Sequence, residues 1–116
     1  MKQRPGPGEA FSPYKRFVSA LLPIGLLASR ELSLGGKVLL ARLYLYAGKK
    51  DHCSPSLETL ARDLAASVDT VGRWMHELAE AGFIRRERKS RAVAVCRLLF
   101  HPALESSYRA DDSADL

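Results

Sequence analysis

Three stretches of the chain repeat apolar residues every three or four positions, which is the spacing of an amphipathic helix. The first stretch predicts a helix over residues 34–47, with Ser33 as its N-cap and Gly48 as its C-cap. Lys37 and Arg42 are the only charged residues in this stretch, so we expect most sides of the helix to be buried. Its apolar stripe consists of Leu34, Val38, Ala41 and Leu45.

The next two stretches predict a pair of short helices that meet across a turn. Ser54-Pro55-Ser56 is a strong helix start, because proline fits the first turn and serine accepts a hydrogen bond from a free amide. This helix stops near Ala65, and Ser67 caps a further helix that ends at Ala81, with Gly82 following it. The apolar stripes are Leu57, Leu60, Ala61 and Leu64 in the first of the pair and Val71, Trp74, Met75 and Leu78 in the second.

Residues 83–99 have a different pattern, which predicts a β-hairpin. The run over residues 92–99 is rich in β-branched residues, and a basic turn separates it from the shorter run that precedes it. Between Arg85 and Arg97 there are six cations and one anion, Glu87. Most of the surplus positive charge of the chain therefore lies on this hairpin.

The two ends of the chain differ from the segment between them. Residues 1–16 contain prolines, glycines and cations without apolar periodicity, and they predict a flexible basic arm. Residues 17–28 are apolar but too few to span a bilayer, and we interpret them as a buried segment of the domain rather than as a signal peptide. Residues 103–116 predict an acidic, disordered tail, which leaves residues 17–102 as the folded domain.

Length and composition limit the chain to one domain with one core. Its 116 residues and 47% hydrophobic content are typical of a single compact globular domain. Lys and Arg number 18 against 13 Asp and Glu, and this surplus favours a polyanionic partner or an acidic membrane surface. Cys53 and Cys96 are too few for a disulfide framework, so we expect a reduced cytoplasmic setting with buried, unmodified thiols.

The order helix, helix, tight turn, helix and basic hairpin is that of a winged helix-turn-helix domain. The expected fold is therefore mostly α with a small β-hairpin. Leu60-Ala61, the turn Ala65-Ala66-Ser67 and the pair Val71 and Trp74 follow the helix-turn-helix pattern, in which a small residue such as Ala61 lets the helices cross closely.

The resemblance extends to a narrower group of proteins. The segment PSLETLARDLAASVDTVGRWMHELAEAGFIRRERK resembles the winged-helix family of plasmid and phage replication initiators and related helix-turn-helix regulators. The segment FVSALLPIGLLASRELSLGGKVLLARLYLYAG resembles the lead-in of the same family. Together the two segments cover most of the chain.

The sequence departs from this family pattern at two positions. The family has glycine at the turn position of Ala65, where a left-handed conformation would cost an alanine about 1 kcal/mol. Gly72 lies inside the helix that follows Ser67, where glycine costs about 1 kcal/mol relative to alanine. Gly72 either lets the helix backbone approach DNA closely or is a weak position that the fold tolerates.

The resemblance implies that the helix after Ser67 is a recognition helix that enters the major groove of DNA. Arg73 is the best candidate to read a base, because its planar guanidinium can bind guanine O6 and N7 together; a phosphate contact is the alternative. Asp69 could accept from cytosine N4, but stabilising the helix N-terminus is its simpler role. The candidate DNA-binding residues of this helix are Ser67, Asp69, Thr70, Gly72, Arg73 and His76.

The hairpin corresponds to the wing of such a domain. Its clustered cations protrude beside the recognition helix, so we expect them to contact phosphates; a solvated charged face without a partner is the alternative. The recognition helix has one cation, Arg73, against Asp69, Glu77 and Glu80, so the wing and the N-terminal arm must supply most of the attraction to phosphate. The candidate DNA-binding residues of the wing are Arg85, Arg86, Arg88, Lys89 and Arg91.

No set of residues in the sequence indicates catalysis, so we expect a protein that is not an enzyme. The three histidines lie in different elements, and there is no glycine-rich phosphate loop. The spacings of His52, Cys53, Cys96 and His101 do not match those of a structural zinc site, so we expect neither a metal ion nor a cofactor.

We interpret the chain as a cytoplasmic protein that binds specific double-stranded DNA, associated with a bacterial nucleoid or plasmid, without a membrane partner or a small-molecule effector. A transcriptional regulator of a mobile element or bacterial locus is the favoured role, because the chain has no room for an added initiator domain. The alternatives are the origin-binding domain of a plasmid or phage replication initiator and a protein-interaction module.

A lone domain of this size makes few DNA contacts, so we expect a homodimer on DNA. Specific binding by such a module usually needs two half-sites about one helical turn apart. The helix over residues 34–47 and the ends of the chain are the candidate surfaces for pairing.

Overall fold

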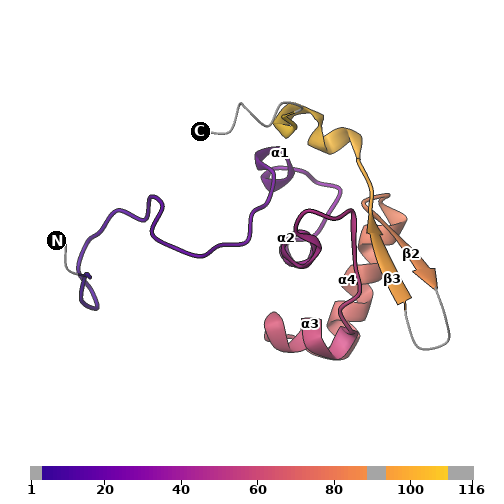
Figure 1. Ribbon diagram of the computed structural model, residues 1–116, viewed down its shortest axis with the longest axis horizontal. Helices are drawn as coiled ribbons and strands as arrows, with labels where there is room; N and C mark the ends of the chain where they lie inside the picture. Colours follow the sequence, from indigo (N-terminus) through magenta and orange to yellow (C-terminus); the bar gives the residue numbers. More distant parts are fainter. Residues whose placement is uncertain (1–3, 89–93, 110–116) are drawn as a thin grey trace.

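The computed structural model describes residues 4–88 and 94–109 of the chain, which are mostly helical with a small antiparallel sheet (Figure 1). This architecture is consistent with the predicted winged helix-turn-helix class. In chain order the elements are α1 (Ile24–Leu27), α2 (Leu34–Ala47), β1 (His52–Cys53), α3 (Leu57–Asp63), α4 (Val68–Glu80), β2 (Ile84–Arg88), β3 (Ala94–Leu98) and the 3-10 helix η1 (Pro102–Ser107).

Serine side chains begin helices α2, α3 and α4, as predicted. Ser33, Ser56 and Ser67 each accept a hydrogen bond from the backbone N–H three residues later, which satisfies one free amide of the first turn. Because Ser56 is the N-cap, Pro55 lies just before α3 and not in its first turn, which corrects the expectation for this proline.

Two residues with left-handed backbone conformations shape the turns on either side of α4. Ala65 has φ 52°, so the strained conformation predicted at this position is present, and the turn brings the N–H of Ala66 to 3.0 Å from the carbonyl of Ala61. Gly82 has φ 87°, a conformation that glycine adopts without a Cβ penalty. The N–H of Phe83 then donates to the carbonyl of Leu78 at 2.9 Å, which ends α4.

Helix α2 buries the side opposite to the predicted stripe. Leu39 and Leu43 are fully buried, whereas Leu34, Val38 and Leu45 are 78%, 54% and 45% exposed. The prediction was wrong because α2 is apolar on nearly all sides, so its sequence does not define which side packs against the domain.

Lys37 is also on the buried side of α2: although it is charged, it is only 7% exposed. Its Nζ donates a hydrogen bond to the carbonyl of Leu27 at 2.8 Å, so the ammonium has a partner and its hydrocarbon stem covers apolar surface. Lys37 thereby connects α2 to the end of α1.

The apolar stripes of α3 and α4 face the core, as predicted. Leu60 and Ala61 of α3 are buried, as are Val71, Met75 and Leu78 of α4. These side chains pack with the buried leucines of α2 into one hydrophobic cluster.

The sheet has three strands in the order β1-β3-β2, and both pairs are antiparallel. The predicted hairpin is confirmed as β2 and β3, with Ile84 opposite Leu98 at its base. Strand β1 was not predicted; it places Cys53 opposite Cys96. A strand of two residues is too short to show an alternating pattern, which is why the sequence does not reveal it.

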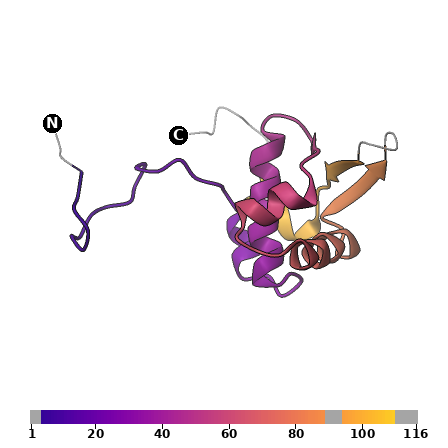
Figure 2. The same ribbon diagram turned by 90° about the horizontal axis from the view of Figure 1, so that it is seen from below.

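Residues 4–21 form no helix or strand, and the N-terminal arm extends away from the packed elements (Figures 1 and 2). Phe17 and Val18 are largely exposed, so the expectation that residues 17–28 are buried is wrong for most of this segment. Only Leu26 is fully buried there, and Leu22 packs partly against the core. Flexibility of the arm stays a prediction.

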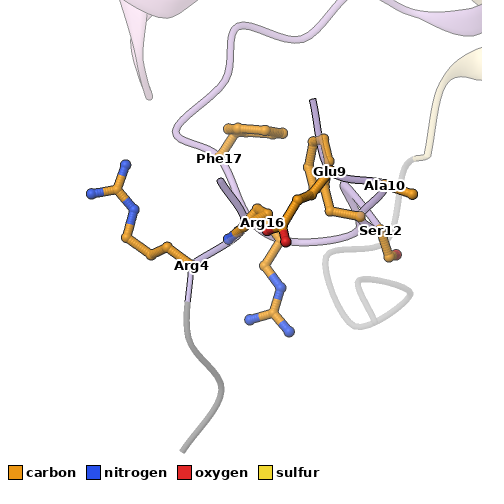
Figure 3. Close-up of a pocket in the computed structure, with 8 residues that line it drawn as sticks. Arg4, Glu9, Ala10, Ser12, Arg16 and Phe17 are labelled. Carbon is orange, nitrogen blue, oxygen red and sulfur yellow. The ribbon is translucent and has the colours of Figure 1, made fainter. Parts of the chain in front are cut away.

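The arm forms a hollow of its own, shown in Figure 3. All the residues that line it lie between Arg4 and Phe17. The hollow therefore offers no site on the packed part of the domain.

The segment expected to be a disordered tail begins with the packed helix η1. Leu104 is buried, and the Oγ of Ser107 accepts a hydrogen bond from the N–H of Gly25 at 2.9 Å, which attaches η1 to α1. The expectation was wrong for residues 103–107, because the acidic composition concealed one apolar anchor next to the helix-initiating Pro102. Residues 110–116 lie outside the described residues.

Candidate nucleic-acid interface

Helices α3 and α4 pack against each other across the short turn, in the arrangement of a helix-turn-helix. Ala61, the small residue predicted at the crossing, is 6% exposed, and it accepts the backbone hydrogen bond that closes the turn. A larger side chain at this position would push the two helices apart. The crossing therefore fixes the orientation of α4 relative to the rest of the domain.

The outward side of α4 holds the predicted recognition residues. Asp69, Arg73 and His76 are exposed. The Oγ of Ser67 donates to the Oγ1 of Thr70 at 2.9 Å, and the Nη2 of Arg73 donates to the same Oγ1 at 3.2 Å. These contacts place the guanidinium of Arg73 over the first turn of α4, where it is open to solvent.

Gly72 of α4 and Gly35 of α2 differ in the space around them. A Cβ built on Gly72 meets no atom within 4 Å, so packing inside the domain does not require glycine at this position. A Cβ built on Gly35 of α2 would lie 2.0 Å from Cε2 of Trp74, because the indole ring packs directly on that backbone. Trp74, a member of the predicted apolar stripe of α4, therefore packs on α2.

Glu77 is used inside the domain. Its Oε1 accepts a hydrogen bond from the Oγ of Ser33 at 2.7 Å, and its Oε2 accepts one from the N–H of Ser33. The carboxylate therefore lies at the N-terminus of α2, where the helix dipole favours negative charge. The outward side of α4 is consequently less acidic than the sequence count implies.

Carboxylates hold two of the cations of the hairpin. Glu87 accepts a hydrogen bond from the Nη2 of Arg97 at 3.0 Å and one from the Nε of Arg85 at 2.9 Å. Arg97 also donates to Asp51 at 2.9 Å. The hydrogen bonds from Arg97 and Arg85 lower the pKa of Glu87 to about 2. More of the positive charge of the wing is therefore neutralised than predicted, because Asp51 as well as Glu87 pairs with Arg97.

Arg86 has different surroundings from Arg85. It is exposed and lies opposite Cys96, a core residue, so it belongs to the face of the sheet that packs on the helices. Strand β2 packs against α4, which places Arg86 on the α4 side of the wing. Within the described part of the chain, no carboxylate lies within ion-pair distance of Arg86.

The remaining predicted wing residues lie toward its tip. Arg88 is exposed at the end of β2 and interacts with another group of the chain. Lys89 and Arg91 lie outside the described residues. The structure thus brings Arg85, Arg86 and Arg88 onto one strand beside α4 and leaves the contribution of the tip as a prediction.

The sequence did not reveal Asp51 or Asp63 as partners of cations. Asp51 reaches Arg97 only through the pairing of β1 with β3, which has no sequence signal. Asp63 accepts hydrogen bonds from the Nε of Arg42 at 3.1 Å and from the hydroxyl of Tyr46. These contacts of Asp63 connect α3 to α2 and so help to hold the helix-turn-helix in place.

The histidines and cysteines form no metal site in the described residues, since no group of three possible ligands gathers there. His101 is already engaged: its ring stacks on Phe83 with centroids 4.0 Å apart, its Nδ1 accepts from the N–H of Ala103, and its Nε2 lies 3.0 Å from Glu31. In the part of the chain that is described, no helix is long and apolar enough to cross a membrane.

Comparison with known families agrees with this geometry. Residues 30–84 match a family model described as a helix-turn-helix domain. No curated protein and no solved structure matches the chain. The chain therefore contains a helix-turn-helix domain that spans α2, α3 and α4, and this domain indicates DNA as a partner. Such domains are typically non-catalytic, and no enzyme family was found.

Proposed function

We propose that this chain binds specific double-stranded DNA, with α4 in the major groove and the wing formed by β2 and β3 on the adjacent phosphate backbone. The observation that carries the proposal is the outward side of α4, where Ser67, Thr70 and Arg73 form a connected row on a helix whose other side is fixed to the core. Major-groove readout needs this combination of a rigid helix and exposed polar side chains.

Within this interface we assign Arg73 to a base and Arg86 to phosphate. Arg73 projects from the first turns of α4, and the N-terminal part of a recognition helix is the part that contacts base edges. Arg86 is on the α4 side of the wing, where its charge is available to a phosphate. Asp69, Gly72 and His76 complete the face that would approach the groove.

The biological role that we propose is transcriptional regulation of a mobile element or bacterial locus by a winged helix-turn-helix protein. Origin binding by a plasmid or phage replication initiator requires the same non-catalytic DNA contact. Selection of bound duplexes from a random pool separates the two roles, because a regulator selects a site found at promoters and an initiator selects a site repeated at an origin. Failure to bind any duplex at low salt would instead favour a protein-interaction module.

The assignment of Arg73 is tested by salt titrations on the selected site and on random duplex. We expect Arg73→Ala to cost about 1–3 kcal/mol of binding free energy on the selected site and much less on random duplex. Arg73→Lys is the matched control, because it keeps the charge and loses the planar fork. Equal losses on both duplexes for Arg73→Ala would remove the base-reading role.

The wing is tested by the dependence of affinity on salt. Arg86→Ala should flatten the plot of log affinity against log salt by roughly 0.9, because one fewer counterion is released from DNA. Arg85→Ala should change the slope less, since Glu87 already holds that cation. An unchanged slope for Arg86→Ala would show that Arg86 is a solvated cation without a phosphate contact.

We also propose that the protein binds DNA as a homodimer, paired through the exposed side of α2. Leu34, Val38, Ala41 and Leu45 follow a 4-3-4 spacing, which is the spacing of a seam between two packed helices. A two-fold axis would place the same stripe of a second copy against it.

The expected result for Val38→Glu is a folded protein that sediments as a monomer and loses affinity for DNA with two half-sites. Its affinity for a single half-site should be unchanged, because α4 and the wing are untouched. Glu58→Lys on the exposed side of α3 is the control for a charge change outside the stripe. Retained dimerisation of Val38→Glu would exclude this surface.

A further inference from the structure

Two buried thiols lie directly opposite each other in the sheet. Cys53 on β1 is the cross-strand partner of Cys96 on β3, and the two side chains are 7% and 5% exposed. Cross-strand partners share one face of a sheet, so both Cβ atoms point in the same direction.

The hydrogen-bond pattern of the ladder fixes the type of this pair. The N–H of Leu98 donates to the carbonyl of Asp51 at 2.8 Å, so these two residues form a hydrogen-bonded pair. Pair types alternate along an antiparallel ladder, and Cys53 and Cys96, two positions further on, are therefore also a hydrogen-bonded pair. The Cα atoms of such a pair are about 5.5 Å apart, inside the range of about 4.4–6.8 Å that a disulfide spans. Its Cβ atoms are about 5.5 Å apart and a disulfide needs about 3.5–4.5 Å, so the short strand β1 must shift toward β3 by about 1 Å when the bond forms.

One of the two thiols is placed to react first. Strand β1 is an edge strand of only two residues, so few hydrogen bonds need to break before Cys53 becomes accessible to a small molecule in solution. The contact with Cys53 and burial raise the pKa of Cys96 in the central strand. Cys53, on the short edge strand, is accordingly the thiol that a small reagent reaches first.

We infer that Cys53 and Cys96 form a reversible redox modification site whose co-substrate is a low-molecular-weight disulfide. The Cys53 thiolate attacks one sulfur of the small disulfide, which breaks its S–S bond, releases one small thiol and forms a mixed disulfide on Cys53. Cys96 then loses its proton and attacks the Sγ of Cys53, which releases the second small thiol. The two protein thiols are oxidised, and the small disulfide is reduced to two thiols.

The cross-link would fasten the wing to the rest of the domain. Cys96 is in β3, the central strand that also pairs with β2. Cys53 is the last residue of β1, the strand that follows the loop after α2, and its Sγ is 3.7 Å from the carbonyl of Leu43. A bond between them closes a long loop that contains α3 and α4, and closing a long loop reduces the entropy of the unfolded chain. Oxidation would therefore stabilise the domain and restrict opening of β1.

The experiment uses the full-length protein, incubated either with oxidised glutathione or with dithiothreitol. Oxidation should remove two hydrogens from the intact mass, leave no thiol that an alkylating reagent can trap after unfolding, and keep the protein free of intermolecular cross-links. We expect the midpoint of thermal unfolding to rise on the order of 10 °C, and dithiothreitol to reverse all these changes. Hydrogen exchange at the amide of Leu98 should slow in the oxidised form.

Variants distinguish this site from general thiol oxidation. Cys53→Ala and Cys96→Ala should show no rise in the midpoint under oxidant, each compared with its own reduced form so that any loss of stability cancels. A wild-type product that carries glutathione on either cysteine without the internal bond would overturn the inference. A covalent dimer, or two thiols that stay free at an oxidising glutathione ratio, would overturn it as well.

Discussion

Helices α2 and α4 pack against each other, yet they divide their surfaces in opposite ways. In α4 the apolar residues lie on one side and are buried, while the polar residues lie on the other side and are exposed. In α2 both sides are apolar, and only one of them is buried. The outward side of α4 is therefore polar, as the proposed DNA interface requires, whereas the outward side of α2 is apolar, as the proposed dimer contact requires.

The difference shows what a hydrophobic pattern can decide. A helix with one apolar stripe has only one side that can enter a core, so the pattern of α4 defines its orientation. A helix with apolar residues all round can be packed in several orientations. In α2 the choice is made by two glycines, because Gly35 and Gly36 allow Trp74 and Glu77 of α4 to approach its backbone.

The largest effect should come from truncating leucines on the two sides of α2. Leu40 is fully buried, so Leu40→Ala should lower the free energy of unfolding by about 2–5 kcal/mol through lost burial and the cavity that remains. Leu45 is 45% exposed, and Leu45→Ala should cost less than about 1 kcal/mol in the monomer. Urea denaturation at low protein concentration measures both values. Equal costs would mean that the exposed side of α2 is not free in solution.

Much of the fold could be predicted from the sequence, because local chemistry determines it. Ser33, Ser56 and Ser67 begin their helices, and Gly82 ends α4, since these residues satisfy backbone groups next to them. The orientation of α2, the strand β1 and the docking of η1 depend on contacts between residues distant in the sequence. No periodicity over a short window contains that information.

The candidate site divides in the same way. The face of α4 was predictable, because exposure follows from one amphipathic pattern, whereas the charges of the wing were not. Glu77 leaves that face by binding Ser33, and Asp51 neutralises Arg97 across a strand pair that the sequence does not show. Counting charges along the chain therefore overestimated both the acidity of α4 and the free basicity of the wing.

A smaller effect should separate the two helical glycines. Gly35→Ala should destabilise the domain by about 1–3 kcal/mol, because its Cβ would overlap the indole of Trp74. Gly72→Ala should stabilise the domain by about 1 kcal/mol, because the added Cβ meets no atom and alanine favours the helix. Thermal and urea unfolding of the two variants measure these opposite signs.

Gly72→Ala also tests the DNA interface, since the variant is expected to be more stable than the wild type. If the backbone at Gly72 approaches DNA, the added methyl group should weaken binding to the selected site despite the gain in stability. Binding measured well below the melting temperature separates the two effects. Unchanged affinity would show that Gly72 is a weak helical position that the fold tolerates.

The smallest effect is a change of stability with pH. It should come from the ion pairs of the wing and not from the apolar contact between α2 and α4. The hydrogen bonds from Arg97 and Arg85 lower the pKa of Glu87 from its ordinary value of 4.5 to about 2 in the folded protein. A carboxylate with a lowered folded-state pKa stabilises the fold above its unfolded-state pKa, and this stabilisation is lost as pH falls through the folded-state value. The free energy of unfolding should therefore decrease between about pH 4.5 and pH 2, and Glu87→Gln should lack this part of the decrease.

Urea denaturation at a series of pH values compares the two proteins, and Glu58→Gln, on the exposed side of α3, is the control for loss of a carboxylate. The side chain of Glu87 is 25% exposed, so solvent and salt partly screen its ion pairs. The difference should therefore be small and should decrease at high salt. Identical pH profiles for the wild type and Glu87→Gln would show that the ion pairs of Glu87 do not contribute measurably to stability.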